Sequence, residues 1–332
     1  MINILAVINT YNLPSLLPFF IDNLNGWSNQ ILPDDYHLDI VISDESSSDL
    51  FRQELEIDLK KRTTDNKRFF SIYHNNHNTV HITFNLAIQY FKAMNNFTYF
   101  IFCSDDCMMI NNKDLSTLLS VFQHSTDIGQ VTALVNRDNA AKWYPKYSGF
   151  EKDSLPVYVS LGEAVNIHLS IYSKFFMEKY DYKYIDVLTA WATESVGTFL
   201  HAAIGTRWAH CKSVQLKHPK NVKPIQKGYS GYNTYKNFRS IESIFEGGVQ
   251  LGLGFECWMN LPELHSTKEN RKKMLKWDKY KFCHMFNKKV YSKTGECKNK
   301  EKLYNYIKEN LFLPKNIFDY DEAIKNVVVG GK

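Results

Sequence analysis

Three groups of polar residues each follow an apolar run that is typical of a buried strand. They are Asn9-Thr10-Tyr11, Ser43-Asp44-Glu45 and Ser104-Asp105-Asp106. Open α/β proteins bind their ligands beyond the carboxyl ends of parallel strands, which meet at one edge of the sheet. The pair Asp105 and Asp106 offers carboxylate oxygens, which suit Mg²⁺ or Mn²⁺ bound together with substrate phosphates. One acid at such a position is usually a helix cap or a solvated turn, whereas three polar strand ends in succession favour a shared binding site.

The segments that would position these residues alternate between strand and helix patterns. Short apolar runs bounded by turn residues predict strands, and apolar residues at helical spacing predict helices. The first half is expected to hold strands at 4–8, 37–43, 69–73 and 99–103, with helices at 16–24, 50–62 and 79–94. Beyond it we expect a helix at 113–123, strands at 129–135, within 157–173 and at 208–217, and a helix at 186–204. The alternation predicts an α/β fold whose central sheet is mostly parallel and covered by helices.

Four segments resemble, in order and spacing, the family 2-like glycosyltransferases of the GT-A fold. They are ILAVINTYN at 4–12, VISDESSSD at 41–49, NNHNTVHITFNLAI at 75–88 and YFIFCSDDCMM at 99–109. The resemblance implies a GT-A-like catalytic domain at 1–218, with a nucleotide-sugar half at 1–110 and an acceptor half at 111–218. A basic, largely helical C-terminal extension would occupy 219–332.

The resemblance also implies roles for the residues at the strand ends. Asn9 and Tyr11 would flank the nucleotide base, and Asp44 would hydrogen-bond the edge of its ring. Asp105 would contact the ribose or the donor sugar, and Asp106 would bind Mn²⁺ or Mg²⁺ bridging the diphosphate. An acid that accepts the imide N–H of uracil favours a UDP-sugar over a GDP-sugar as the donor.

The sequence departs from the family's pattern in three places. Ser43 and Glu45 stand where the family often has Asp and Gly, and Asn78 replaces a frequent Gly. The metal motif reads Ser-Asp-Asp, so its first acid is missing. The sequence supports the fold more firmly than it supports the choice of base or the strength of metal binding.

Two later residues complete the predicted site. The family's catalytic base commonly lies in a Glu-Asp pair that opens a late helix, and residues 191–205 are similar to that region. Counting back from Gly205 places Ser195 at the base position, so the predicted base is its neighbour Glu194, which would make the transfer inverting. The alternative for Glu194 is a first-turn acid that stabilises the helix dipole. His218 follows the last predicted core strand and is expected to reach the metal or the diphosphate; a structural histidine is the alternative.

These residues predict a metal-dependent glycosyltransferase that moves a sugar from a nucleoside-diphosphate donor to a hydroxyl acceptor. The alternative is a non-catalytic nucleotide- or nucleic-acid-binding module in which the acid pair is structural. A nicotinamide-dependent Rossmann enzyme and a P-loop NTPase are excluded, because GxGxxG and GxxxxGK[ST] are missing after the first strand.

The charge distribution leaves several acceptors open. Residues 268–308 carry fourteen Lys and Arg against four acids, a net charge of +10 in a chain whose total is +5. This segment interleaves its cations with the aromatic residues Trp277, Tyr280, Phe282, Phe286 and Tyr291. The combination fits a polyanion, including DNA with a hydroxyl-bearing modified base, or an anionic membrane surface contacted peripherally. A solvated lysine-rich face is the simplest alternative.

A glycan or polysaccharide is the family's usual acceptor. The aromatic residues that could stack on its sugar rings are Trp143, Tyr144, Tyr147 and Phe150.

Composition indicates the broad class of protein. Apolar residues make up 44% of the 332-residue chain, enough for a sizeable core. No apolar run reaches the roughly 18 residues of a transmembrane helix, and the start of the chain lacks the basic region of a signal peptide. The six cysteines are scattered without a CxxC, as in reduced proteins. The sequence therefore predicts a cytoplasmic protein without a transmembrane segment.

Overall fold

The computed structural model describes residues 1–74, 80–124, 126–136, 157–158, 168–183, 200–201, 203–218, 301, 304–305 and 319–330. Several sequence predictions lie outside these residues. They concern Glu194 and its helix, the aromatic residues between 143 and 150, and the basic segment 268–308.

The described residues form one sheet with strand order β10-β3-β2-β1-β4-β8-β6-β9-β5, with β7 paired to β9. The strands are β1 (Ile2–Tyr11), β2 (Tyr36–Glu45), β3 (Lys67–His74), β4 (Tyr99–Ser104), β5 (Met108–Met109), β6 (Ile128–Asn136), β7 (Val157–Tyr158), β8 (Leu169–Ser173), β9 (Arg207–Lys217) and β10 (Val328–Gly330). Neighbouring strands from β3 through β4 run parallel, as do β6 and β9. β8 is antiparallel to both β4 and β6 and joins the two parallel parts. The expected mostly parallel α/β sheet is confirmed.

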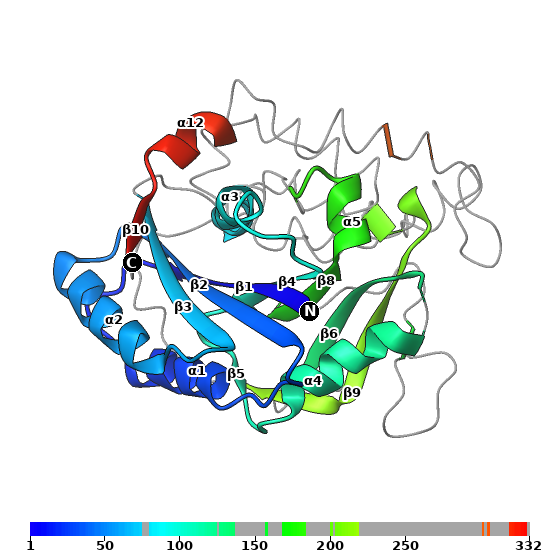
Figure 1. The fold of residues 1–332 in the computed structure, drawn as a ribbon, viewed down its shortest axis with the longest axis horizontal. Helices are drawn as coiled ribbons and strands as arrows, with labels where there is room; N and C mark the ends of the chain where they lie inside the picture. The colour runs from blue at the N-terminus through cyan, green and yellow to red at the C-terminus, as the bar shows by residue number, and fades with distance from the viewer. Residues whose placement is uncertain are drawn as a thin grey trace, which may run out of the picture.

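Helices cover both faces of the sheet (Figure 1). α1, α2 and α4 lie on one face, and α3, α5 and α12 lie on the other. Their bounds are α1 (Pro18–Ser28), α2 (Asp49–Arg62), α3 (Val80–Phe91), α4 (Asp114–Ser120), α5 (Lys174–Lys179) and α12 (Tyr320–Lys325), with a 3₁₀ turn, η1, at Val121–His124. Because helices cover both faces, the central strands are buried on both sides: residues 4–8 of β1 have no exposed surface.

Local sequence signals explain where these helices begin and end. The Ser48 hydroxyl caps α2 by accepting the Phe51 N–H, and Asp49 places negative charge in the first turn. The last turn carries Lys60, Lys61 and Arg62, which complement the partial negative charge of the helix C-terminus. α1 instead begins with Pro18, whose missing N–H costs nothing at that position.

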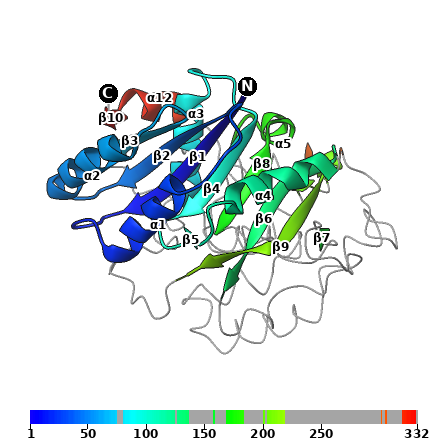
Figure 2. The same ribbon diagram turned by 60° about the horizontal axis from the view of Figure 1, so that its bottom comes forward.

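The end of the chain returns to the first half of the sheet. β10 pairs antiparallel with β3, and α12 packs against α3, where the Asn85 amide donates to the Tyr320 hydroxyl at 3.3 Å. Figure 2 shows β10 at the edge of the sheet beyond β3, with α12 beside it. The division at 218/219 stays a prediction, because most of the segment between β9 and α12 lies outside the described residues.

Candidate active site

The acidic pair lies in a tight turn directly after β4. The Cys107 N–H donates to the Ser104 carbonyl at 3.3 Å and closes the turn around Asp105 and Asp106. Asn23, a buried residue of α1, donates its side-chain amide to the carbonyls of Ser104, at 3.0 Å, and of Cys107. Asn23 therefore fixes the backbone on both sides of the two carboxylates.

The pairing of β8 with β4 brings a histidine to this turn. Leu169 pairs with Cys103, so His168, one residue earlier, lies beside Ser104. The Ser104 N–H donates to the His168 carbonyl at 2.9 Å, and the Ser104 hydroxyl donates to the same oxygen at 3.3 Å. The register of two antiparallel strands thus joins positions that are 64 residues apart.

The pairing of β9 with β5 brings a second histidine from the other side. Met108 pairs with Lys217, so His218 lies next to the acidic turn. Its Nε2 is 2.9 Å from Asp106 Oδ2. The rings of His168 and His218 are 5.3 Å apart, centroid to centroid.

The four side chains Asp106, Cys107, His168 and His218 offer ligand atoms within 4.8 Å of one another. Asp106 and both histidines are partly exposed, whereas Cys107 is fully buried. A carboxylate with two imidazoles is a donor set that suits Mn²⁺ and other transition metals better than Mg²⁺. The residues present therefore fit a divalent metal ion, with Asp106, His168 and His218 as the residues that would hold it.

The two carboxyl groups of the turn differ in their pKa values. Burial alone would raise the pKa of Asp106, but the hydrogen bond and charge of His218, together with the charge of His168, hold it at about 2. The pKa of Asp105 is raised to about 8, first by burial and then by the neighbouring charge of Asp106. Asp106 is therefore the acid of the pair that stays ionised at neutral pH.

Asp44, at the end of β2, has no exposed side-chain surface. Its Oδ1 accepts the Thr10 hydroxyl at 2.8 Å and also the Ser47 hydroxyl. Among the described residues Oδ2 accepts no hydrogen bond, and it lies 3.9 Å from Arg52 Nε. Burial raises the pKa of this carboxyl, while its hydroxyl partners and Arg52 lower it. One oxygen of Asp44 thus fastens β1 to β2, and the other lies within ion-pair distance of the Arg52 guanidinium.

The remaining predicted residues lie between these two acids. In the parallel registers Asn9 of β1 pairs with Ser43 on one side and Ser104 on the other. Asn9 is nearly buried, and Tyr11 is half-buried at the same edge. The structure therefore places the three polar strand ends side by side. Glu194, the predicted base, lies outside the described residues.

Comparison with solved structures identifies the architecture. The structure of S. aureus TarS 1–349 in complex with UDP-GlcNAc superimposes with a TM-score of 0.51 at 14% identity, covering 95% of this chain and 83% of that one. The fold is the GT-A fold. GalNAc-T7 with UDP, GalNAc and Mn²⁺ gives a TM-score of 0.50 at 11% identity and covers 87% of this GT-A chain.

The GT-A chain spans only part of several structures that it matches. It covers 58% of the GalNAc-T7 chain and 60% of another TarS 1–349 structure. In sequence, no protein-family model and no curated protein matches it.

Two residues that the sequence analysis missed matter in this site. His168 lies just before β8, a segment that the sequence predicts as strand but does not align with β4. Asn23 lies in a predicted helix beside Asp22 and Asn25, and nothing in the sequence distinguishes it from an exposed polar residue. Both owe their positions to pairing or packing between segments far apart in the chain.

Proposed function

We propose that this protein is a metal-dependent glycosyltransferase that uses a nucleoside-diphosphate sugar, with a UDP-sugar as the favoured donor. The observation that carries the proposal is the convergence of Asp106, His168 and His218 at the carboxyl end of the sheet of a GT-A fold. The three residues come from three segments of the chain, and their ligand atoms lie close enough together to share one ion.

Each residue of the site has a defined task in this proposal. Asp106, His168 and His218 would hold Mn²⁺, which stabilises the negative charge of the departing diphosphate when it is bound. Asp105 would hydrogen-bond the ribose or the donor sugar. Glu194 would take the proton of the acceptor hydroxyl, and attack from the opposite face would invert the anomeric centre.

The preference for UDP rests on the strand ends of β1 and β2. Asn9 and Tyr11 would flank the uracil ring, and Asp44, whose Oδ2 is enclosed, would accept its imide N–H after a neighbouring side chain moves aside. The TarS and GalNAc-T7 structures contain UDP-GlcNAc and UDP, respectively, which supports the same choice. Thermal-shift measurements with UDP, GDP, CDP and TDP in the presence of Mn²⁺ test it, and stabilisation by GDP alone would contradict it.

The acceptor is proposed to be a hydroxyl of a glycan or of a polyanion such as DNA with a modified base. The basic segment 268–308 supports the polyanion, and the aromatic residues between 143 and 150 support the glycan. Duplex DNA should bind at low salt and weaken steeply as the salt concentration rises. A flat salt response, or unchanged binding after Arg271, Lys272, Lys273 and Lys276 are replaced by Glu, would leave the glycan acceptor.

The direct test of the proposal is release of UDP from a panel of UDP-sugars with Mn²⁺ and with EDTA. We expect turnover with Mn²⁺, loss of turnover in EDTA, and loss in Asp106→Ala but not in Asp34→Ala, which removes an exposed acid far from the site. UDP binding without turnover of any donor would instead favour a non-catalytic nucleotide-binding module.

None of the helices in the described part of the chain is long and apolar enough to cross a bilayer.

A further inference from the structure

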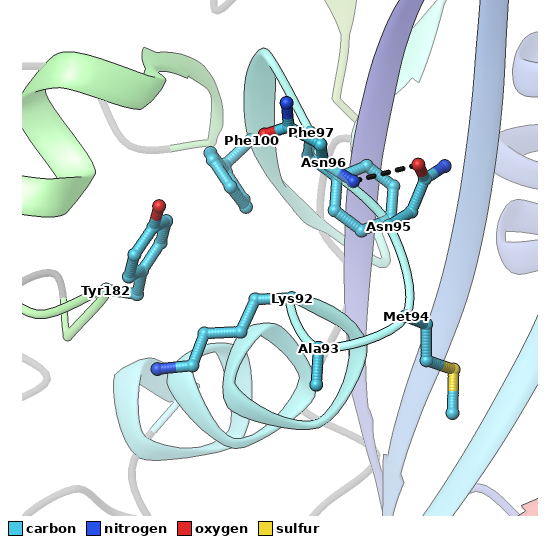
Figure 3. Close-up of a pocket in the computed structure, with 8 residues that line it drawn as sticks. All are labelled: Lys92, Ala93, Met94, Asn95, Asn96, Phe97, Phe100 and Tyr182. Atoms are coloured by element: carbon cyan, nitrogen blue, oxygen red, sulfur yellow. Dashed lines mark hydrogen bonds between the residues drawn. The ribbon is translucent and has the colours of Figure 1, made fainter.

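A pocket at the end of α3 contains polar side chains that do not converge. Figure 3 shows the Lys92 ammonium on one side of this pocket and the carboxamides of Asn95 and Asn96 on another, pointing apart. These groups do not surround one point at which a small ligand would contact all of them. The acidic turn after β4 differs in this respect, because its ligand atoms do converge.

The acidic turn holds a sulfur atom as well as the oxygen and nitrogen atoms of the proposed Mn²⁺ site. The thiol of Cys107 belongs to the four ligand atoms, with those of Asp106, His168 and His218, that lie within 4.8 Å of one another. Of the three cysteines in the described part of the chain, only Cys107 joins this group. A buried cysteine usually acts as a small packing residue. Its place beside three other ligand atoms gives the Cys107 sulfur a chemical role as well.

The main chain of Cys107 is fixed at both of its polar groups. Its N–H donates to the Ser104 carbonyl at 3.3 Å, and its carbonyl accepts the side-chain amide of Asn23. Only one torsion angle places the sulfur of a cysteine, and it has three staggered positions. A fixed backbone therefore limits the sulfur to few positions relative to the Asp106 carboxylate and the two imidazoles.

The spacing of the four ligand atoms suits Zn²⁺. Bonds of about 2.0–2.3 Å from zinc to oxygen, nitrogen and sulfur place the ligand atoms of a tetrahedron roughly 3.3–3.8 Å apart. His218 Nε2 lies 2.9 Å from Asp106 Oδ2, and the whole set fits within 4.8 Å. Side-chain shifts of about 1 Å therefore complete a tetrahedron around one ion. Thiolate sulfur selects Zn²⁺ over Mn²⁺ and Mg²⁺, which prefer oxygen ligands.

We propose that Asp106, Cys107, His168 and His218 form a four-coordinate Zn²⁺ site that overlaps the proposed Mn²⁺ site. Zinc binding replaces the S–H bond of Cys107 with a Zn–S bond, and the thiol proton passes to the buffer. Four protein ligands complete the coordination of Zn²⁺, whereas a site that binds substrate keeps a position open. Zinc therefore excludes the diphosphate that Mn²⁺ would bind. This last consequence, unlike the zinc site itself, rests on the proposed function.

Cobalt substitution tests the sulfur ligand without nucleotide or turnover. Co²⁺ adopts the same tetrahedral coordination as Zn²⁺, and a thiolate bound to it gives a charge-transfer absorption band in the near ultraviolet. We expect this band in the metal-free wild-type protein after Co²⁺ is added, and its loss in Cys107→Ser. Cys211→Ser changes another buried cysteine, in β9, and is the matched control that should keep the band. Absence of the band in the wild type, or an unchanged band in Cys107→Ser, would overturn the proposal.

Zinc affinity tests the same set of ligands through a second residue. Competition with a chromophoric chelator measures the Kd for Zn²⁺. Cys107→Ser and Asp106→Ala should each raise this Kd at least about tenfold, because losing even an outer partner of a metal site costs about 10–100-fold. Asp106 is partly exposed, so its variant keeps the test decisive if Cys107→Ser does not fold, which thermal unfolding reports. An unchanged Kd in Asp106→Ala would overturn the zinc site.

Failure of the zinc site is distinguishable from failure of the proposed function. UDP titrated with Zn²⁺ in place of Mn²⁺ should bind no more tightly than in EDTA, and stronger binding would overturn the four-coordinate site. A Co²⁺ spectrum without a sulfur band would remove Cys107 from the site and leave the Mn²⁺ site of the proposed function standing. UDP binding that ignores Mn²⁺, in a protein with the expected Co²⁺ spectrum, would overturn the proposed function and support the zinc site alone.

Discussion

Asp44 and Asp106 follow parallel strands of the same sheet, yet their surroundings differ. Asp44 is enclosed, and one of its oxygens holds two hydroxyl groups of the chain itself. Asp106 keeps 29% of its side-chain surface and meets two histidines that come from other strands. An acid at a strand end is therefore not by itself a ligand-binding group. The neighbours brought by strand register decide how much of its carboxylate is already used by the fold.

The largest effect on donor turnover is expected at Asp106, the partly exposed acid. Asp106→Ala should lower donor turnover about 10³-fold or more, because it removes the carboxylate that would hold the metal, a loss of about 4 kcal/mol in transition-state stabilisation. The free energy of unfolding should change by no more than about 1–2 kcal/mol, since the side chain is partly exposed. Kinetics of UDP release and urea unfolding measure the two quantities. A large loss of stability would mean that Asp106 serves mainly to stabilise the fold.

Replacing the enclosed acid, Asp44, should instead cause a large loss in the free energy of unfolding. Asp44→Ala leaves the hydroxyls of Thr10 and Ser47 without their acceptor, at an expected cost of about 2–4 kcal/mol in the free energy of unfolding. Asp49→Ala is the matched control, because Asp49 is almost fully exposed and lies 3.9 Å from the same Arg52. Such exposed pairs contribute about 0–1 kcal/mol. Equal losses in the two variants, measured by urea unfolding, would remove the distinction between enclosed and open acids.

His168 tests whether the pairing of β8 with β4 completes the metal site around Asp106. His168→Ala should weaken Mn²⁺ binding at least about tenfold, as expected for loss of a ligand. Titration of Mn²⁺ followed by its electron paramagnetic resonance signal measures this without any turnover. His124→Ala removes an exposed histidine and serves as the control. Unchanged Mn²⁺ affinity in His168→Ala would reduce the site to Asp106 and His218.

A third polar cluster is enclosed like that of Asp44. His201 lies between the Thr206 hydroxyl, 2.8 Å from Nδ1, and Gln130 Oε1, 2.9 Å from Nε2. Burial lowers the pKa of His201 to about 3, so the folded protein keeps it neutral while the unfolded chain protonates it below about pH 6.5. Stability linked to this residue is therefore lost as the pH falls from about 6.5 toward 3.

His201→Gln should make the stability less dependent on pH. Glutamine does not titrate, so the slope of the unfolding free energy between pH 6 and 4 should fall by about 1.4 kcal/mol per pH unit relative to the wild type. Urea unfolding at several pH values measures the slope. An unchanged slope would mean that His201 is accessible to protons in the folded protein.

Much of the fold could be predicted from the sequence, because its signals are local. The strands β1 to β4 are apolar runs that end in turn residues, and their ends lie within a few residues of the predicted ones. β5 and β10 were missed, because two or three residues carry no periodicity. The return of the chain end to β3 depends on a pairing between segments more than 250 residues apart, for which no local pattern exists.

The candidate site could be predicted only in part, for the same reason. Asp106 and His218 were named from the turn and the strand that precede them, and the structure places their side chains 2.9 Å apart. His168 depends on the register of an antiparallel strand, and the enclosure of Asp44 depends on Thr10 and Ser47 folding over it. Neither register nor burial of a polar group can be read from residue types alone.

In the proposed function, Asp106, His168 and His218 form a metal site for a nucleoside-diphosphate sugar. Isothermal titration of UDP into the wild-type protein, with Mn²⁺ and then with EDTA, tests for this site. We expect saturable binding with Mn²⁺, at least about tenfold weaker binding in EDTA, and the same weakening in Asp106→Ala. UDP binding of equal strength with and without Mn²⁺, or no binding under either condition, would contradict it.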